Sequence, residues 1–325
     1  LLRKRYDYII SVVPCFQFGL LGVYYKKLRK AVLLYHVQDL QIEAARDLKM
    51  IKSPVVLNVL FKLEKFIFKH ADSISSISEG MVRRTRLKAK KDVYLFRNWT
   101  DCKQFYPLED RASLKQKFGF SATDKIVLYS GAIGEKQGLD SIIHAARALR
   151  DQQHLKFIIC GSGPYRDVLQ MLASKLKLRN ITFLPTQPLE AFNQFLNMAD
   201  VHLVIQKSTA GDLVMPSKLT TILGIGGLAI ITANEGTSLY TLINQHKVGI
   251  LVEPENQEAL NNAIKTAVIE DNKDLKLNAR TYAEEFLSMG KIMEAFNEQV
   301  LKSFIKHDKQ RAEQEPVLPV ELELG

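Results

Sequence analysis

The sequence predicts an α/β protein with two domains, each built around a parallel β-sheet that helices cover. Short apolar segments typical of buried strands alternate with segments of helical periodicity along nearly the whole chain, which is the pattern of parallel sheets. The length of 325 residues is about twice that of a typical domain. No apolar run approaches the roughly 18 residues that span a bilayer, so we expect no transmembrane helix.

The first domain is expected to be half of a doubly wound domain. Glu64, in the middle of its second helix, is expected to form a solvent-exposed ion pair with Lys65 or Lys69. The chain begins with Leu1 and enters a strand almost at once, so we expect the true N-terminus upstream and this domain to be incomplete. Strands are predicted near residues 8–13, 31–35, 73–77 and 93–96, and helices near 16–29, 54–71 and 79–88.

A connector with turn residues and a short helix near 110–117 precedes a regular alternation of strands and helices. Strands are predicted near 125–130, 155–160, 181–184, 200–205, 228–232 and 248–252. Helices are predicted near 139–151, 165–176, 189–198, 217–225, 237–244 and 256–269, with amphipathic segments near 274–287 and 290–306. We divide the chain into a partial N-terminal domain (1–107), a connector (108–124), a second domain (125–272), C-terminal helices (273–308) and a disordered tail (309–325).

The net charge of +10 is unevenly distributed. Residues 1–107 hold 21 lysines and arginines against 9 acidic residues, whereas the remainder is nearly balanced. The basic residues concentrate at 3–5, 26–30 and 83–91, and such clusters attract anionic lipid head groups. The alternative is a solvated face that only confers solubility. Nucleic acid is not an expected partner, because the basic runs contain no recognised reading motif.

The three cysteines give an odd count and show no paired metal-ligand spacing, which suits a reducing compartment.

Glycine-rich loops follow the first two strands of the second domain. The first contains Gly131, Gly134 and Lys136, and the second contains Gly161 and Gly163. Ligands of open α/β sheets bind at the carboxyl ends of the strands, where a glycine turn and a helix N-terminus present N–H groups to an anion. The alternative interpretation is a pair of tight turns with a surface lysine.

A long connection after the strand at 200–205 brings further polar residues to the same edge of the sheet. It contains Lys207, Asp212, Pro216, Ser217 and Lys218. Long loops at such positions are commonly functional, and the added cations predict a polyanionic ligand.

The ordered combination of these motifs resembles the large family of retaining glycosyltransferases with two facing Rossmann-like domains, the GT-B fold of family 4 or group 1 type. The resemblance covers about residues 126–270, and the segments Gly131–Gly138 and Pro216–Leu219 are similar to those of colanic-acid and exopolysaccharide glycosyltransferases. Segments 36–39, 75–80 and 97–101 of the first domain also have counterparts in that family. The final helices resemble those that brace the N-terminal domain.

The resemblance implies roles for residues on both sides of the cleft between the domains. Lys136 would contact the diphosphate of the donor, and Gly161 and Gly163 would lie beside the nucleotide. His36 and Asp39 would face the cleft and act on the acceptor or the sugar. A hydrogen-bonded turn is the alternative for this pair.

The sequence departs from the family at three positions. An arginine common after the first glycine is Ala132 here, so its charge is absent or supplied by Lys207 or Lys218. Two glutamates of the family fall at Leu213 and Thr221. The Thr221 hydroxyl could replace the ribose anchor, and Asp212 could stand in near the sugar.

We therefore expect a nucleotide-sugar-dependent, retaining hexosyl glycosyltransferase of bacterial exopolysaccharide biosynthesis. Its acceptor would be lipid-linked or a polysaccharide, met at the inner face of the cytoplasmic membrane by a cytoplasmic, peripheral protein. No metal ion or other cofactor is expected. A catalytically silent partner subunit and a nucleotide-sugar epimerase of the same fold are the alternatives, and the departures at Ala132, Leu213 and Thr221 favour the silent subunit.

Overall fold

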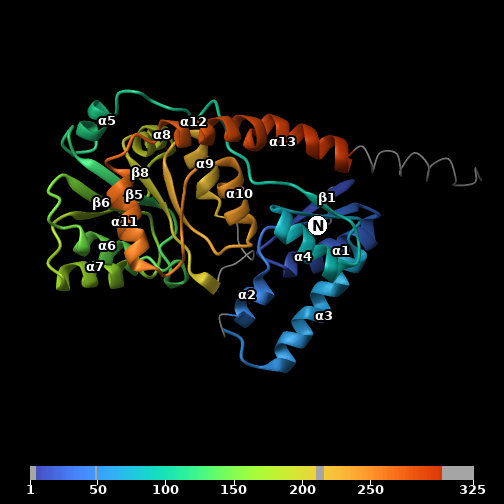
Figure 1. Ribbon diagram of the computed structural model, residues 1–325. Helices are drawn as coiled ribbons and strands as arrows, with labels where there is room; N and C mark the ends of the chain where they lie inside the picture. Colours follow the sequence, from blue (N-terminus) through green and yellow to red (C-terminus); the bar gives the residue numbers. More distant parts are fainter. Residues whose placement is uncertain (1–4, 48–49, 210–215, 302–325) are drawn as a thin grey trace, which may run out of the picture.

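The computed structural model describes residues 5–47, 50–209 and 216–301, which form two α/β halves joined by a linker (Figure 1). Each half contains one parallel sheet, so the predicted fold class is confirmed. The predicted tail lies outside the described residues, as does the interior of the long loop at 210–215.

The first half contains a four-stranded sheet in the order β1-β2-β3-β4. All its strands are parallel, and β1 is an edge strand that pairs with β2. The predicted strands and helices are present, but the short helix α2 was not predicted. The elements are β1 (Tyr8–Val13), α1 (Gln17–Arg29), β2 (Val32–Val37), α2 (Gln41–Asp47), α3 (Pro54–His70), β3 (Ser73–Ser76), α4 (Glu79–Ala89) and β4 (Val93–Leu95).

The second half contains a six-stranded parallel sheet in the order β10-β9-β8-β5-β6-β7. All six predicted strands and six predicted helices are present. Its strands are β5 (Lys125–Ser130), β6 (Leu155–Cys160), β7 (Ile181–Leu184), β8 (Val201–Val204), β9 (Ala229–Thr232) and β10 (Ile250–Val252). Its helical elements are η1 (Glu135–Gln137), α6 (Asp140–Ala148), α7 (Arg166–Lys175), α8 (Leu189–Asn197), α9 (Lys218–Gly224), α10 (Ser238–His246) and α11 (Gln257–Ala267).

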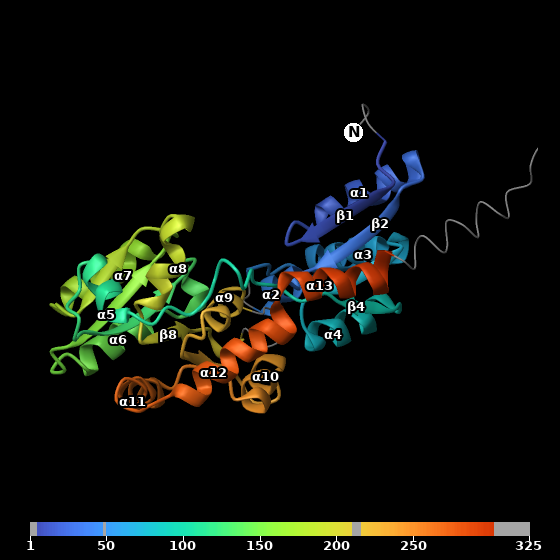
Figure 2. The ribbon, with the colours of Figure 1, turned by 90° about the horizontal axis from the view of Figure 1, so that it is seen from above.

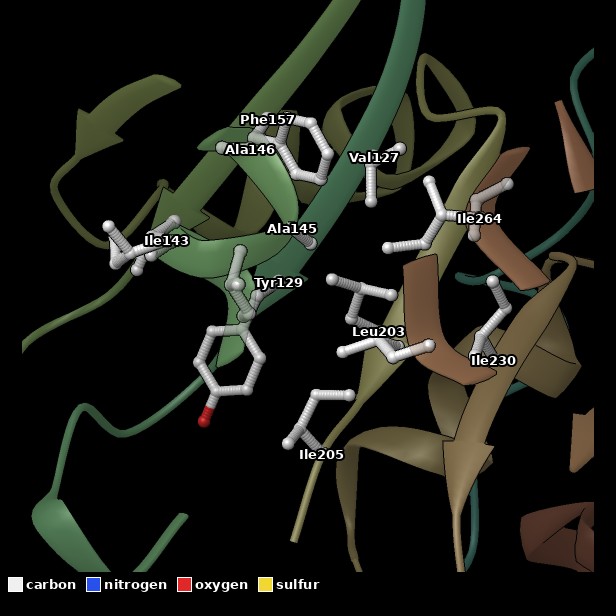
Figure 3. Packing of buried hydrophobic residues seen from close by; sticks show 14 of the residues in the cluster. Val127, Tyr129, Ile143, Ala145, Ala146, Phe157, Leu203, Ile205, Ile230 and Ile264 are labelled. Atoms are coloured by element: carbon white, nitrogen blue, oxygen red, sulfur yellow. The ribbon is translucent and has the colours of Figure 1, made fainter. Parts of the chain in front are cut away.

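The core of the second half lies between the central strands and the helices that cover them (Figure 3). Phe157 and Leu203 of the sheet face Ile143 of α6 and Ile264 of α11, and all four are fully buried. A second cluster on the opposite face includes Phe195 of α8. Because both faces are covered, these strands are continuous apolar runs, which explains why they were predictable.

The linker at 97–124 is attached to the second half. It contains helix α5 (Arg111–Lys117), whose buried Lys115 pairs with Asp200 at 2.8 Å. Arg280 of helix α12 (Lys273–Tyr282) donates to the carbonyl oxygen of Phe105 at 2.9 Å. The linker is therefore fixed to the body of this half.

The C-terminal helices cross from the second half to the first (Figures 1 and 2). Thr100 of the linker forms a β-bridge with Ser288, and the Phe296 ring stacks on Phe96 with centroids 4.4 Å apart. Val300 is buried against Leu34 in the same cluster. After α12 the chain forms the π-helical segments η3 (Ala283–Leu287) and η4 (Asn297–Leu301) around helix α13 (Met289–Phe296).

The described residues include no helix that is both long enough and apolar enough to cross a membrane.

Candidate active site

A cleft of about 1090 Å³ opens between the carboxyl ends of the two sheets. Its second-half wall follows β5, β6, β7 and β8, and its first-half wall follows β2, β3 and β4. The strand ends of the second half, where the sequence predicted the donor site, face a wall from the first half, and the resemblance had implied such a cleft between the domains. The residues that line the cleft include Asp39, Ala44, Trp99, Gly131, Ala132, Gly161, Pro216, Ser217, Lys218 and Thr221.

The two glycine-rich loops of the cleft pack against each other through their backbones. The N–H of Gly131 donates to the carbonyl of Cys160 at 3.0 Å, and that of Ile133 donates to Ser162 at 2.9 Å. A Cβ atom at Gly161 would lie 1.9 Å from the Gly131 oxygen, and one at Gly163 would lie 2.1 Å from the Ile133 oxygen. Gly161 and Gly163 are therefore required for the contact between the two loops. The sequence had suggested another reason for these glycines, the close approach of a ligand to the backbone.

Gly134 also belongs to this packed turn. A Cβ atom there would lie 2.7 Å from Oε1 of Gln137, a buried oxygen without a hydrogen-bond partner. Gln137 lines the cleft, whereas Gly134 is outside the lining.

Lys218 places a cation in the cleft beside the first glycine loop. Its Nζ lies 3.5 Å from the centroid of the Tyr129 ring, and a Cβ at Gly131 would lie 2.8 Å from it. Burial lowers the pKa of Lys218 to about 7, because a cation removed from water loses hydration. No ion pair within the described ranges offsets this cost. An anionic ligand at this point would restore the charged form.

Other residues of the predicted donor site are divided between two cavities. Pro216, Ser217 and Thr221 line the cleft together with Lys218. Lys207 instead lines an adjacent crevice of about 100 Å³ that also contains Glu255. Of the two lysines proposed to replace the family's arginine, Lys218 lies in the cleft beside Ala132.

Two predicted residues cannot be assigned contacts. Lys136 lies in η1 between the two glycines of its loop, but its side chain is outside the described part of the structure. Asp212 falls within the segment 210–215, which is also outside it.

The predicted pair His36 and Asp39 is separated by the structure. Asp39 lines the cleft, whereas His36 lies in β2 and not in a loop. Its ring is 3% exposed, with Nδ1 2.9 Å from the Ser75 hydroxyl and the ring edge against Phe96. Burial lowers its pKa to about 4, so His36 is neutral at physiological pH. The cleft-facing position expected for His36 is therefore not observed.

Sequence reasoning missed part of the cleft wall. Thr186 and Gln187 follow β7, and Leu189 and Phe192 belong to α8. Pro185 directly follows the strand predicted at 181–184, and Pro188 ends the loop. These two prolines could have indicated the loop. Trp99 of the linker also lines the cleft, and the centroid of its ring lies 5.6 Å from that of Phe96.

The described ranges contain no group of three or more histidine, cysteine, aspartate or glutamate side chains that could hold a metal ion.

Two parallel α/β halves that face each other across a cleft define the class of GT-B glycosyltransferases. The chain belongs to the family Glycosyl transferases group 1, which residues 110–285 match. It is 36% identical over 303 residues to a protein of Escherichia coli K12 named as the colanic acid biosynthesis glycosyl transferase WcaI, covering 90% of this chain and 74% of that protein.

Solved structures agree on the fold. Sucrose-phosphate synthase of Thermosynechococcus elongatus superposes with a TM-score of 0.76 and 20% identity, over 94% of this chain and 75% of that one. HepE of Anabaena, in complex with UDP and glucose, superposes with a TM-score of 0.74 and 18% identity, over 93% of this chain and 78% of that one.

Proposed function

We propose that this glycosyltransferase transfers a hexosyl group from a nucleotide-sugar donor to a lipid-linked or polysaccharide acceptor, with retention of anomeric configuration, in bacterial exopolysaccharide biosynthesis. The similarity to WcaI supports the biosynthetic role. The complexes of HepE with UDP and with UDP-glucose support a nucleotide-sugar donor.

The observation that carries the donor proposal is the half-buried ammonium group of Lys218 in the cleft. A lysine placed beside an aromatic ring, without a carboxylate partner in the described ranges, is costly unless the site also receives an anion. The diphosphate of a nucleotide sugar is such an anion. Lys218 would take the place of the arginine that Ala132 replaces.

The same placement accounts for transition-state stabilisation. During transfer, the bond between the anomeric carbon and the diphosphate oxygen breaks, and a bond to an acceptor hydroxyl oxygen forms. Because retention keeps both oxygens on one face of the sugar, the hydroxyl proton passes to the leaving diphosphate. Negative charge develops on that diphosphate, where the Lys218 cation and the proposed contact of Lys136 would stabilise it. In this proposal no metal ion is needed.

The first-half wall would bind the acceptor. Asp39 lies there, in the half opposite to that of Lys218. The positive charge of the first 107 residues supports a cytoplasmic protein that meets an anionic membrane surface peripherally, where a lipid-linked acceptor is found.

The basic clusters named from the sequence are partly used inside the fold. Lys88 pairs with two glutamates, and Lys91 donates to the carbonyl of Ala71 at 2.8 Å. Lys26 pairs with Asp72 at 2.5 Å. These lysines are therefore less available to lipid than the sequence suggested.

A transfer assay tests the proposed function. The full chain is incubated with radiolabelled UDP- and GDP-hexoses and a bacterial membrane lipid extract, and product is extracted into organic solvent. We expect labelled lipid with one donor and its loss in Lys218→Met. Donor binding without transfer would favour the silent partner subunit, and a changed sugar without transfer would favour the epimerase.

A further inference from the structure

We propose that a second cavity, at the seam between the two halves, binds the phosphate group of a lipid-linked acceptor together with the first apolar carbons attached to it. We call this cavity, of about 180 Å³, the seam chamber. The inference rests on the proposed function, because it identifies the part of the acceptor that is held outside the cleft.

The seam chamber is enclosed by elements of both halves. Its walls come from α4 and residues 97–98 on one side, and from α9, α10 and α12 on the other. Helices α4 and α10 meet at the seam (Figures 1 and 2), where the N–H of Gly80 donates to the Ser238 hydroxyl at 2.8 Å. The lining residues of the described chain begin at Ile77, so the chamber lies at the β3 and β4 side of the first-half sheet, away from β1.

The seam chamber communicates with the cleft at one end and with solvent at the other. Four residues line both cavities, namely Ile77, Asn98, Pro216 and Thr220. At the other end, the lining residue Gln245 of α10 is exposed. The volume of the chamber far exceeds the roughly 10–15 Å³ that one water molecule needs. A small group of a ligand that also enters the cleft therefore fits there.

The charges of the seam chamber favour an anionic group. Arg83 and Arg97 line it, and Glu79 is the one acidic residue among the described residues of the lining. Arg97 and Glu79 pair at 3.3 Å, but their side chains are 34% and 67% exposed, so this pair costs little to break. Arg83 forms no ion pair within the described ranges. Two guanidinium groups are suited to the oxygens of a phosphate group.

Leucine side chains form part of the second-half side of the chamber. Leu219 and Leu223 of α9 lie one turn apart, and Leu242 of α10 and Leu287 of η3 join them. Inorganic phosphate would leave these side chains in contact with water, whereas the hydrocarbon attached to a lipid phosphate would cover them. The lining therefore favours a lipid phosphate over the free ion.

Helix α9 places the seam chamber beside the proposed donor site. Lys218 and Thr221 line the cleft only, whereas Leu219 and Leu223 line the chamber only. A helix with its side chains is about 10 Å across. The acceptor phosphate would thus lie across α9 from the donor diphosphate, and the acceptor would enter the cleft through the end that the two cavities share.

Calorimetric titration of the full chain with geranyl diphosphate tests the inference. Saturating UDP occupies the proposed donor site throughout, so the titration reports a second site. We expect geranyl diphosphate to bind at least tenfold more tightly than inorganic pyrophosphate, which has no hydrocarbon. Arg83→Gln should weaken the binding of geranyl diphosphate at least tenfold. The matched control is Arg84→Gln, on the same helix but outside the lining, which should bind within twofold of the unchanged chain.

Glu79→Gln provides a test of opposite sign. It removes the carboxylate of the lining and releases Arg97, so geranyl diphosphate should bind at least as tightly as to the unchanged chain. Weaker binding in this variant would contradict the anionic character of the ligand. UDP affinity, measured separately, should be the same in all variants, because Glu79, Arg83 and Arg84 lie outside the cleft lining. Circular dichroism confirms that each variant is folded.

Three further outcomes would overturn the inference. They are absence of geranyl diphosphate binding at saturating UDP, equal losses in Arg83→Gln and Arg84→Gln, and equal affinities for geranyl diphosphate and pyrophosphate, which would indicate a site for free phosphate. If the chain binds UDP and transfers sugar but does not bind geranyl diphosphate, the seam chamber fails while the proposed function stands. If UDP does not bind but geranyl diphosphate binding still depends on Arg83 and not on Arg84, the proposed function fails while the seam chamber stands.

Discussion

The two halves of the molecule differ in their charge and in the wall that each contributes to the cleft. The second half buries a six-stranded sheet on both faces, with fully buried side chains from β5, β6, β8 and β9. The first half has a four-stranded sheet, with fully buried side chains in β2 and β3. The first half also carries the excess positive charge.

This difference assigns different tasks to the two halves. A closely packed half can fix the positions of Lys218 and the glycine loops to within the tolerance that phosphate binding needs. A half with an excess of positive charge is suited to meet a large anionic partner.

The largest effect is expected from Gly161→Val in the second half. A Cβ atom there would meet the Gly131 oxygen at 1.9 Å, and φ is +143°, so both contact and conformation oppose a side chain. We expect a loss of about 4 kcal/mol or more in the free energy of unfolding. Gly119→Val is the control, because φ is +84° there but no atom lies within 4 Å of the added Cβ. Urea denaturation that gives equal losses for the two variants would contradict the packing role.

The next effect is expected from Lys88→Met in the first half. Lys88 pairs with Glu43 of α2 and Glu64 of α3, so its removal leaves two largely buried carboxylates without a cation. We expect a loss of about 3 kcal/mol. Hydrogen exchange should rise in α2 and α3 and stay unchanged in the second half, and Lys88→Arg should restore part of the protection. Unchanged hydrogen exchange in α2 would show that the ion pairs of Lys88 do not stabilise this helix.

The acceptor wall provides a third comparison, between Asp39 and His36. Asp39 lines the cleft and His36 does not, so Asp39→Asn should lower the transfer rate about 100-fold, the scale of a lost polar catalytic contact. UDP affinity should stay unchanged, because UDP is expected on the opposite wall. His36→Gln should keep the rate within about threefold at pH 7.5. A larger loss in His36→Gln than in Asp39→Asn would reverse the assignment.

Each half also contains one buried histidine, which allows a comparison of pH dependence. Burial lowers the pKa of His36 to about 4, and the pKa of His202 in β8 is lowered to about 3 by burial and by nearby Arg111 and Lys276. As the pH falls below about 6.5, the unfolded chain takes up these protons first. The contribution of the two neutral histidines to the free energy of unfolding is therefore complete above pH 6.5 and is lost as the pH falls toward 4.

The matching variant is His36→Gln. Between pH 6.5 and 4.5, the free energy of unfolding of the first half should fall by about 2 kcal/mol less in this variant than in the unchanged chain. The fall in the second half should be the same in both proteins. Hydrogen exchange measured at several pH values separates the two halves. An unchanged pH profile of the first half would contradict the buried neutral state of His36.

The sequence predicted the second half more completely than the cleft. Strands buried on both faces leave long apolar runs, and these predicted β5 and β6 with the bounds observed. Lys218 and Pro216 were predictable because they lie at the start of a helix that follows a strand. Thr186 and Gln187 were missed because a short polar loop has no periodicity, and only the flanking prolines mark it.

Errors arose where distant segments meet. Glu64 was expected to pair with Lys65 or Lys69, but it points inward and pairs with Lys88, 24 residues later. His36 and Asp39 are three residues apart, yet the strand ends between them at Val37 and gives them different environments. Gly161 and Gly163 were assigned to a ligand, and the sequence did not reveal that the first loop supplies the carbonyl oxygens that exclude a side chain from both positions. Such contacts depend on tertiary packing, which local patterns do not contain.

The central claim is that Lys218 supplies the charge for a donor diphosphate, and calorimetric titration with UDP tests it most directly. We expect Lys218→Met to weaken UDP binding at least tenfold, as for a charge-assisted hydrogen bond worth about 1.5–3 kcal/mol. The control Lys207→Met, outside the cleft, should stay within twofold. Burial lowers the pKa of Lys218 to about 7 in the protein without ligand, so most Lys218 side chains are neutral at pH 8. UDP binding at pH 8 should therefore be accompanied by proton uptake in the unchanged chain, and by less uptake in Lys218→Met. Equal UDP affinity and equal proton uptake in the two proteins would contradict the claim.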